Sequence, residues 1–300
     1  MGQFVDGPVR VSVPATSANL GPGFDSLGLA LDLRDELVGE ITGEGLDVEV
    51  RGVCADEVPR DGSHLVVRAM RAAFRAMALT PPGLRLGCDN AIPHGRGLGS
   101  SAAAIVGGAA LARALVTDGE TLLDDDALLR IAAGIEGHPD NVAPALHGGF
   151  VISGREGADF YAVQSSVDPR VSVVVFVPPD PVSTELARGL LPDEVPHADA
   201  AADAGRTALL VAALAERPEH LFVATRDFLH QEFRRTAMPE SLALVDRLRE
   251  DGIAATVSGA GPTVLVFTTG DGQVAALLDR CPPTWEGRHL DIDRAGVRAG

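Results

Sequence analysis

The segment PHGRGLGSSAAAIVGG, residues 93–108, restricts what this chain can fold into more than any other stretch. Glycines at positions 95, 97 and 99 allow a tight backbone turn, and two serines and small helix-forming residues follow them. Consecutive amides in such a turn point into one concavity, and the following helix adds its positive N-terminal end. The segment therefore predicts an anion-binding turn before a helix near Ser100, although a plain turn before a capped helix fits the same residues.

The chain contains no lysine, because all 25 residues counted as Lys or Arg are arginines. A Walker A loop needs Gly-Lys-Ser/Thr and a protein kinase needs a strand lysine, so both classes are excluded. The dinucleotide fingerprint G-x-G-x-x-G also fails, because Ser100 stands where its third glycine belongs. Any phosphate at this loop must be held by backbone N–H groups, hydroxyls and arginine.

Charge and cysteine content narrow the class of partner. The formal net charge is −17 at pH 7, and nucleic-acid binding needs a basic surface, so we expect no nucleic-acid partner. Cys54, Cys88 and Cys281 are widely spaced, which argues against a disulfide framework or a zinc ribbon. Because no apolar run reaches membrane-spanning length and the first residues lack the apolar core of a signal peptide, we expect a cytoplasmic protein with no membrane partner.

Apolar periodicity and turn residues predict strands and helices in irregular alternation. The expected strands are Val9–Val13, Val48–Val53, Leu84–Cys88, HGGFVIS, VSVVVFVPP and two strands joined by a turn in IAATVSGAGPTVLVF. The expected helices are His64–Ala78, Ser100–Val116, a helix capped by Asp124–Asp126 and ending near Ile135, Ala198–Ala215, and GQVAALLDR. After Val13 we expect a loop rich in Pro, Ser, Asn and Gly. This order predicts an α+β fold with two lobes that meet near Tyr161–Asp168.

Four motifs together give the chain a specific resemblance. The loop PHGRGLGSSAAA resembles the P-x-x-x-G-L-G-S-S-A-A loop of the GHMP kinases, a superfamily that includes galactokinases, homoserine kinases and mevalonate kinases. Residues 14–25, PATSANLGPGFD, and residues 136–149, EGHPDNVAPALHGG, are similar to motifs of its homoserine kinase branch. Residues 256–267, TVSGAGPTVLVF, resemble its C-terminal glycine motif. One glycine loop is a weak signal, but four motifs in the family's order and spacing are a strong one.

The resemblance implies a two-lobed α+β architecture, with an N-terminal ATP-binding lobe over residues 1–163 and a C-terminal ferredoxin-like lobe over residues 164–300. It also implies ATP-dependent phosphorylation of L-homoserine to O-phospho-L-homoserine, a step of threonine biosynthesis. The expected ligands are therefore ATP, Mg²⁺ and a small amino-acid substrate. A homodimer is a further expectation.

In the family the glycine loop wraps the triphosphate of ATP. The resemblance assigns this role to Pro93, His94, Gly95, Arg96, Gly97, Leu98, Gly99, Ser100, Ser101, Ala102 and Ala103. It also implies that Ser101 and Glu136 bind Mg²⁺, and a hydroxyl and a carboxylate, completed by phosphate oxygens and waters, suit that ion. A solvated carboxylate at a helix end is the alternative for Glu136. His64 stands where relatives often have an asparagine near the adenine, which leaves the adenine contacts open.

The family's N-terminal motif binds the amino-acid end of homoserine, which points to Asn19 and Asp25. An aspartate suits the ammonium, and an asparagine can bond both the ammonium and the hydroxyl, although both residue types also stabilise turns without any ligand. A substrate carboxylate suits the planar fork of an arginine. By resemblance the other substrate-binding residues are Arg188, Arg234, Thr184 and His138.

The predicted catalytic residues are Asn141, Asp140 and Arg234. In the wider superfamily an aspartate at this motif takes the proton of the attacking hydroxyl, whereas in the homoserine kinase branch the asparagine orients that hydroxyl. Positioning and charge neutralisation carry much of phosphoryl transfer. We therefore expect Asn141 to orient the hydroxyl, and Asp140 to be either a base or a turn residue.

Two other functions remain open at this point. One is another GHMP kinase, acting on mevalonate or a sugar, and the other is a ligand-binding relative without catalysis. Asp25 with Arg188 and Arg234 favours an amino acid, because a zwitterion needs both of its charges matched. Ser101 and Glu136 argue against the loss of the metal site.

Overall fold

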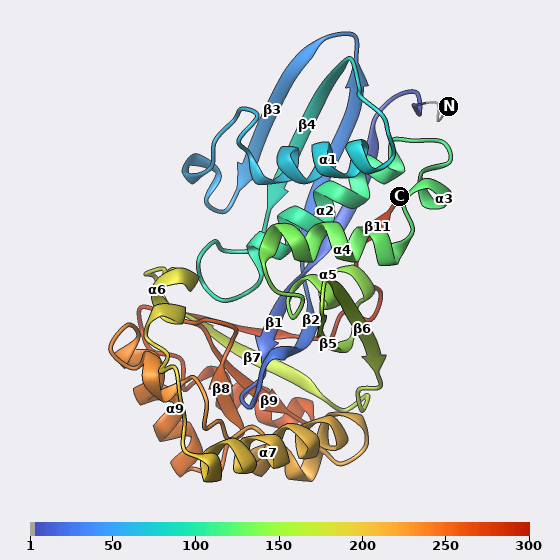
Figure 1. Cartoon of the computed structure of the whole chain (residues 1–300). Helices are drawn as coiled ribbons and strands as arrows, with labels where there is room; N and C mark the ends of the chain where they lie inside the picture. The colour runs from blue at the N-terminus through green and yellow to red at the C-terminus, as the bar shows by residue number, and fades with distance from the viewer. Residues whose placement is uncertain (1–3) are drawn as a thin grey trace.

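The computed structural model describes residues 4–300, apart from the side chain of Asp271, and its chain forms two lobes (Figure 1). Within the described residues the N-terminal lobe is built on a seven-stranded sheet with the order β11-β1-β2-β4-β3, and β5 and β6 extend it from β2. Its strands are β1 (Val9–Asn19), β2 (Gly23–Thr42), β3 (Gly45–Gly52), β4 (Gly83–Asn90), β5 (Phe150–Glu156), β6 (Asp159–Ser165) and β11 (Arg298–Ala299).

The ribbon of β1 and β2 corrects one expectation. The sequence predicts a loop after Val13, but β1 continues to Asn19 and β2 begins at Gly23 after a short turn. The prediction was wrong because Pro, Ser, Asn and Gly are typical of loops, whereas here most of them lie in paired strands. The pairing of β1 with β2 shifts register after Pro14 and after Ala18, and such bulges admit residues that a regular strand excludes.

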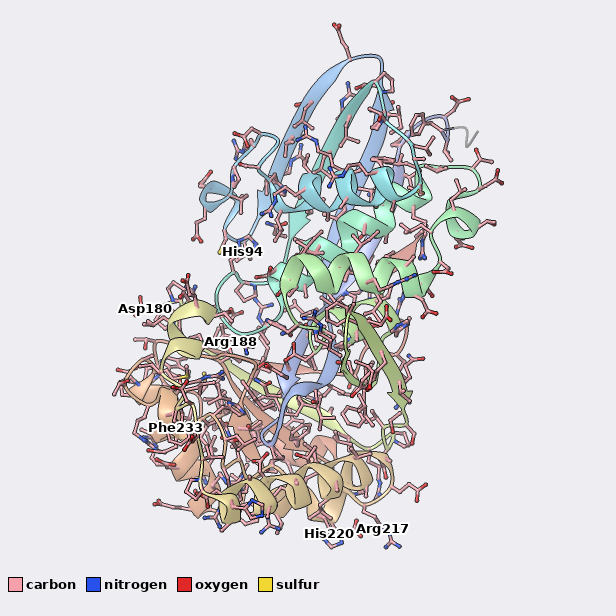
Figure 2. The ribbon with its side chains drawn as sticks, in the orientation of Figure 1. His94, Asp180, Arg188, Arg217, His220 and Phe233 are labelled. Carbon is pink, nitrogen blue, oxygen red and sulfur yellow. The ribbon has the colours of Figure 1, made fainter. Side chains whose placement is uncertain are left out.

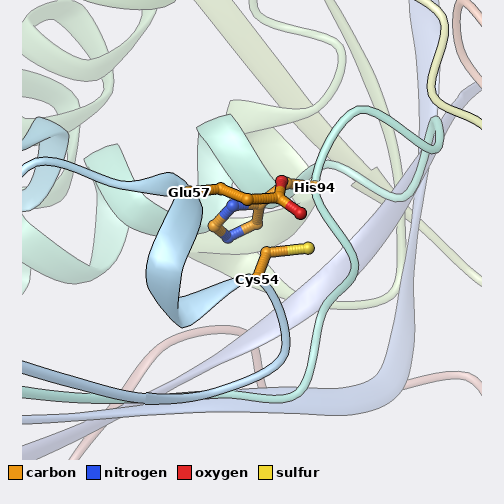
Figure 3. Close-up of side chains that lie close together, drawn as sticks. All are labelled: Cys54, Glu57 and His94. Atoms are coloured by element: carbon orange, nitrogen blue, oxygen red, sulfur yellow. The ribbon is translucent and has the colours of Figure 1, made fainter.

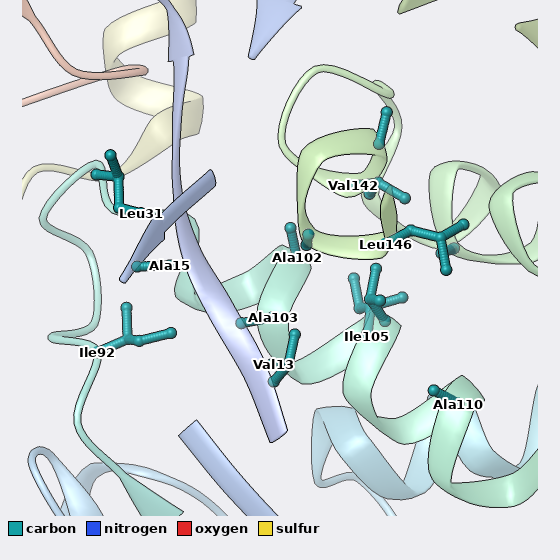
Figure 4. Close-up of a cluster of buried hydrophobic side chains, with 14 of the residues drawn as sticks. Val13, Ala15, Leu31, Ile92, Ala102, Ala103, Ile105, Ala110, Val142 and Leu146 are labelled. Carbon is teal, nitrogen blue, oxygen red and sulfur yellow. The ribbon is translucent and has the colours of Figure 1, made fainter. Parts of the chain in front are cut away.

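Helices of the N-terminal lobe lie against one face of the sheet (Figure 1). They are η1 (Ala55–Glu57), α1 (Leu65–Ala76), α2 (Ser100–Ala114), α3 (Gly119–Leu122), α4 (Asp125–Glu136) and α5 (Val142–His147). A Cβ on Gly108 of α2 would lie 2.6 Å from the carbonyl oxygen of Val66 in α1, so glycine lets these two helices pack closely. Val13 and Ala103 are fully buried where α2 meets β1, and Ile105 is almost fully buried on the other side of α2, near Leu146 of α5 (Figure 4).

The C-terminal lobe has the strand order of a ferredoxin-like sheet, as the resemblance implies. Within the described residues its four antiparallel strands run β10-β7-β9-β8. The strands are β7 (Ser172–Val177), β8 (Ala255–Val257), β9 (Val264–Thr268) and β10 (Glu286–Leu290). The helices are α6 (Thr184–Gly189), α7 (His197–Ala215), η2 (Pro218–His220), α8 (Leu221–Ala224), η3 (Glu232–Arg234), α9 (Pro239–Glu250), η4 (Asp271–Gln273) and α10 (Val274–Leu278). Every residue of β7 is buried, which explains its uninterrupted apolar sequence.

The end of the chain returns to the N-terminal lobe, where β11 pairs with β1 (Figure 1). On the way, the backbone of Asp293 exchanges hydrogen bonds with Gly149 (2.6 Å) and Ala30 (3.0 Å), and its carboxylate forms an ion pair with Arg34. Where the chain first leaves the N-terminal lobe, strand β6 runs to Ser165, two residues past the expected boundary at residue 163. The division into residues 1–163 and 164–300 therefore stays a proposal about the chain's lobes. No helix of the described residues is long and apolar enough to cross a membrane.

Candidate active site between the two lobes

The glycine loop, residues 93–99, turns its carbonyl groups toward the protein and leaves its amides free. Gly95, Gly97 and Gly99 have φ angles of 64°, 77° and 69°, in the left-handed region that glycine tolerates. The loop carbonyls accept bonds from both lobes, namely Thr16 N to Leu98 O (3.1 Å), Thr263 N to Arg96 O (3.2 Å) and the Ser258 hydroxyl to Gly97 O (2.6 Å). Among the described residues no protein acceptor takes the backbone N–H groups of residues 95–102. Free amides at a helix N-terminus suit an anion.

The first turn of α2 differs from the expected capping. Gly99 is the N-cap residue and no side chain caps the helix, so Ser100 and Ser101 are its first two residues rather than N-caps. The Ser101 hydroxyl instead donates to Glu136 Oε2 at 2.6 Å. Burial raises the pKa of Glu136, and the bond from Ser101 lowers it by less. Burial makes the ionised form of this carboxylate unfavourable. A divalent cation bound by the carboxylate and the neighbouring hydroxyl would stabilise the ionised form.

His138 and Asp140 form a close pair, with 2.6 Å between Nδ1 and Oδ1. Burial lowers the pKa of His138, but Asp140, Glu136 and Asp25 together outweigh it and raise the pKa above its ordinary value. The imidazole is therefore easier to protonate than a free histidine. One oxygen of the buried Asp140 carboxylate is committed to this ring.

Asn141 stands at the N-terminus of α5 and, with His138 and Asp140, lines a cavity of about 150 Å³. Its Oδ1 accepts a hydrogen bond of 2.8 Å from the hydroxyl of Thr16, which is fully buried in β1. This bond fixes the orientation of the Asn141 amide, so that its NH₂ group remains available as a donor.

Asp25 and Arg188 meet across the lobes in a two-bond fork. Arg188 Nη2 lies 2.7 Å from Asp25 Oδ1, and Nη1 lies 2.8 Å from Oδ2. Asp25 comes from β2 and Arg188 from α6, on the edge of the C-terminal lobe that faces the glycine loop (Figure 2). The pair therefore places a carboxylate and a guanidinium in one cavity.

Arg234 is buried to 2% exposure at the back of the cavity. Its guanidinium donates to the carbonyls of Ala187 (3.3 Å) and Gly259 (3.2 Å), and to His230 Nδ1 at 3.0 Å. His230 Nε2 lies 2.7 Å from the carbonyl of Gly21, so Nε2 carries the proton and the ring is neutral. Burial, followed by the charge of Arg188, lowers the pKa of Arg234 to about 10, and the side chain stays positive at neutral pH.

The Asn19 amide has structural duties as well. Asn19 has φ 67°, its Oδ1 accepts from the backbone N–H of Asp25 at 3.0 Å, and its Nδ2 donates to Gly259 O at 2.9 Å. These bonds fix the turn that presents Asp25 and join it to the C-terminal lobe. One N–H and the remaining lone pairs of the amide are left for a ligand.

Two cavities lie along this cleft. One of about 150 Å³ is lined by the loop glycines and the first serines of α2, and by the predicted side chains Asn19, Asp25, Glu136, His138, Asp140, Asn141, Thr184, Arg188 and Arg234. A second, of about 260 Å³, is lined by Val58, His64, Leu65, His94 and residues of α2. Ser100 and Ser101 line both, so the start of α2 separates the two spaces.

Some residues expected at the nucleotide do not present side chains to the 150 Å³ cavity. Leu98, Ala102 and Ala103 are at most 1% exposed and pack in the core. The guanidinium of Arg96 donates to the carbonyls of Pro178 (3.1 Å) and Pro179, so it links the loop to the C-terminal lobe. Whatever these residues contribute to a phosphate site must come from their backbone.

Sequence reasoning missed Phe24 and Thr16. The ring of Phe24 stacks on His230 at 5.1 Å between centroids, and the guanidinium carbons of Arg188 and Arg234 lie 5.5 Å and 5.6 Å from its centroid. Both residues belong to the motif PATSANLGPGFD, in which only Asn19 and Asp25 were singled out. Their membership of this motif was the available signal, since Phe24 directly precedes Asp25 and Thr16 lies three residues before Asn19.

Comparison with known families agrees with this geometry. The model of the GHMP kinases N terminal domain matches residues 64–149, and the model of the GHMP kinases C terminal domain matches residues 206–286. The matched segments contain the glycine loop, Glu136 and Asn141 in one lobe and Arg234 in the other. The chain belongs to the GHMP kinase family.

The most specific matches carry one description. A homoserine kinase of Streptomyces coelicolor is 54% identical over 96% of this chain and 93% of its own length. A homoserine kinase of Clavibacter michiganensis is 51% identical over 96% of this chain and 92% of its own length. The structure of a putative homoserine kinase from Listeria monocytogenes has 31% identity and a TM-score of 0.76, over 97% of this chain and 99% of that one. A homoserine kinase structure from Cytophaga hutchinsonii has a TM-score of 0.84 at 24% identity, over 99% of both chains, and shows the shared fold.

Proposed function

We propose that this chain transfers the γ-phosphoryl group of ATP to the hydroxyl of L-homoserine, giving ADP and O-phospho-L-homoserine for threonine biosynthesis. The observation that carries the proposal is one cavity that holds Asp25, Arg188 and Arg234 beside the glycine loop. Opposite charges in one small cavity match a zwitterion, and the relatives above 50% identity are homoserine kinases. A mevalonate or a sugar has no ammonium group for Asp25.

Each end of homoserine has partners of suitable chemistry in the cavity. In this proposal Asp25 binds the ammonium, and Arg188 and Arg234 bind the carboxylate. Thr184 and His138 line the space between them, and Asn19 adds its remaining N–H or lone pairs. Phe24 holds the two guanidinium groups apart by lying against both.

The reacting hydroxyl is best served by Asn141. Its amide is oriented by Thr16 and has a free NH₂ group, whereas Asp140 already bonds His138. We therefore propose that Asn141 orients the hydroxyl and that Asp140 acts by positioning the ring of His138. Phosphoryl transfer has a loose transition state, so orientation and charge neutralisation supply much of the catalysis.

The phosphates of ATP would lie over the free amides of residues 95–102, with the nucleoside in the cavity lined by His64 and Leu65. Ser101 and Glu136 have the hydroxyl and carboxylate oxygens that suit Mg²⁺, which neutralises phosphate charge in such reactions. This chain's own part is to hold the two oxygens 2.6 Å apart in a half-buried place. A homodimer and a cytoplasmic location remain predictions.

The test is a coupled ADP-release assay with ATP and Mg²⁺ across L-homoserine, mevalonate, galactose and L-threonine. L-Homoserine should be turned over far faster than mevalonate or galactose, and phosphorus NMR should identify a phosphate monoester on its hydroxyl. L-Threonine has the same zwitterion but a differently placed hydroxyl, so it reports on hydroxyl orientation. Equal or faster turnover of an alcohol without an amino-acid group would refute the assignment.

A further inference from the structure

Three potential metal ligands converge beside His94, which is one of them and which lines the 260 Å³ cavity. Cys54 precedes η1, Glu57 is the last residue of η1, and His94 belongs to the glycine loop (Figure 3). The thiol sulfur, one carboxylate oxygen and one imidazole nitrogen all lie within 4.8 Å of one another. Cys54 and His94 are half-buried and Glu57 is exposed, so the cluster is open to solvent on one side.

The three donor groups have no competing hydrogen bonds. Among the described residues, neither the sulfur of Cys54, the carboxylate of Glu57 nor the ring of His94 takes part in a side-chain hydrogen bond. Cys54 also has φ 58°, a left-handed conformation that is uncommon for a residue with a side chain. Val53 N donates to Asn90 O at 2.8 Å, and this bond holds the strained turn beside the segment that leads to the glycine loop. Local strain of this kind is concentrated at functional sites.

We propose that Cys54, Glu57 and His94 bind a zinc-class transition-metal ion, and that an ion bound there opposes ATP binding. A thiolate, an imidazole and a carboxylate are the ligands that Zn²⁺ takes in proteins, and three protein ligands leave a fourth position for water. Mg²⁺ prefers oxygen donors in octahedral geometry, so this site differs in selectivity from the Ser101 and Glu136 pair.

The cluster needs little rearrangement to hold such an ion. Donor atoms around a tetrahedral zinc lie about 3.3–3.7 Å apart, so a contraction of about 1 Å suffices. The exposed side chain of Glu57 can supply its own part of this movement, and the side chains of Cys54 and His94 must supply the rest.

An ion at this place would restrain the glycine loop. His94 lines the cavity that we assign to the nucleoside, together with Val58, His64 and Leu65. A bond from the ion to His94 would fix this wall of the cavity to η1, so that the His94 ring could not move to admit a nucleoside. The inhibitory part of the inference rests on the proposed function, whereas the binding part does not.

Metal binding is tested on the full chain without nucleotide, using Co²⁺ as a spectroscopic probe and Zn²⁺ in competition with a chromophoric chelator. The wild-type chain should bind one equivalent, with a thiolate-to-cobalt charge-transfer band. Cys54→Ser should lose that band and weaken Zn²⁺ binding by at least about tenfold, since outer-shell partners alone are worth that much. Cys281→Ser and His220→Gln are matched controls, because Cys281 is another half-buried thiol and His220 lies at the far end of the C-terminal lobe (Figure 2). A Cys54→Ser chain with unchanged Zn²⁺ affinity and an unchanged Co²⁺ spectrum would overturn the site.

Inhibition is tested by titrating Zn²⁺ into the kinase assay at several ATP concentrations, with free Zn²⁺ set by a metal buffer because ATP itself chelates the ion. Inhibition of the wild-type chain should weaken as ATP rises. Cys54→Ser should keep its activity without zinc and need at least about tenfold more free Zn²⁺ for half-inhibition. Equal inhibition of both chains would overturn the inhibitory link. If the chain lacks kinase activity altogether, the cobalt spectrum still decides whether the site exists.

Discussion

Arg188 and Asp25 bind each other through two hydrogen bonds of 2.7 Å and 2.8 Å, in the cavity where each would bind an opposite end of the same substrate. They cannot keep this fork and also hold an ammonium and a carboxylate. A zwitterion replaces both partners at once, because its ammonium takes Asp25 and its carboxylate takes Arg188. An amine or an acid alone would break the ion pair and give only one of its two charges a new partner. The pair therefore favours ligands that have both charges.

Replacement of Arg188 by lysine keeps the charge but removes the fork. We expect kcat/KM for L-homoserine to fall roughly ten- to hundredfold, which corresponds to about 1.5–3 kcal/mol for a lost charge-assisted bond. Homoserine methyl ester lacks the carboxylate, so it should be a poor wild-type substrate and should lose little more in the variant. The two substrates on the two enzymes form a cycle that isolates this contact. An equal loss for the ester would place Arg188 outside carboxylate binding. Arg234 is less suitable for this test, because its replacement would unpair the buried carbonyls of Ala187 and Gly259.

Glu136→Gln keeps the shape of the side chain and removes its charge. We expect kcat to fall by about tenfold or more, and the Mg²⁺ concentration for half-maximal rate to rise, while ATP affinity changes less. Steady-state rates across a Mg²⁺ titration measure all three quantities. Glu250→Gln is the matched control, since Glu250 is likewise the last residue of a helix but is exposed on α9. If Glu136→Gln behaves like this control, the residue is a helix-end carboxylate.

Gly97→Ala should disturb the glycine loop. An added Cβ would lie 2.3 Å from the carbonyl oxygen of Ser258, at a φ of 77° that side chains rarely adopt. We expect a stability loss of about 1–3 kcal/mol and weaker ATP binding, read from thermal unfolding and nucleotide titration. Gly205→Ala in α7 meets no atom within 4 Å and should stabilise the chain by about 0.5–1 kcal/mol. Normal stability and ATP binding in Gly97→Ala would contradict the described loop conformation.

Asp35 gives stability a pH dependence of its own. Burial raises its pKa from 3.8 to about 6, although hydrogen bonds from the backbone N–H groups of Ile92 and Ala91 lower the pKa in part. Below pH 3.8 the carboxyl is neutral in both the folded and the unfolded chain, so its burial costs no stability. As the pH rises from 3.8 through about 6, the free energy of unfolding falls, because the unfolded chain ionises this group more readily. Asp35→Asn should therefore unfold with less pH dependence between pH 4 and 7, and be relatively more stable at pH 8 by about 1–3 kcal/mol. Denaturant unfolding at several pH values measures this difference, and parallel curves for the two chains would contradict it.

Much of the fold could be predicted from local pattern. The expected helices Ser100–Val116 and Ala198–Ala215 occur as Ser100–Ala114 and His197–Ala215, since a long periodic helix is a strong signal. Asp124 caps α4 by accepting from the N–H of Ala127, as its residue type predicted. The 20-residue strand β2 was missed, because two of its pairing partners, β4 and β5, are distant segments and its start contains turn residues. Long-range pairing overrides local propensity there.

The site was predictable as a set of residues but not as a set of contacts. The motifs pointed to Asp25, Arg188 and Asn141, and the structure places all three in one cavity. No pattern predicted that Asp25 and Arg188 bind each other, or that Thr16 orients Asn141, because such contacts join residues far apart in the chain. The convergence of Cys54, Glu57 and His94 was invisible for the same reason, as their spacing matches no metal motif.

The return of the last residues to the first sheet has a consequence during synthesis. Asp293 bonds Ala30 and Gly149, and β11 pairs with β1, so the N-terminal lobe is completed by residues that follow the whole C-terminal lobe in the sequence. Residues 293–299 must therefore be synthesised before the lobe that was made first can close. Until then β1 has an open edge in a nascent chain, the condition under which strands pair with the wrong neighbour. The first lobe to be synthesised is thus the last to be completed.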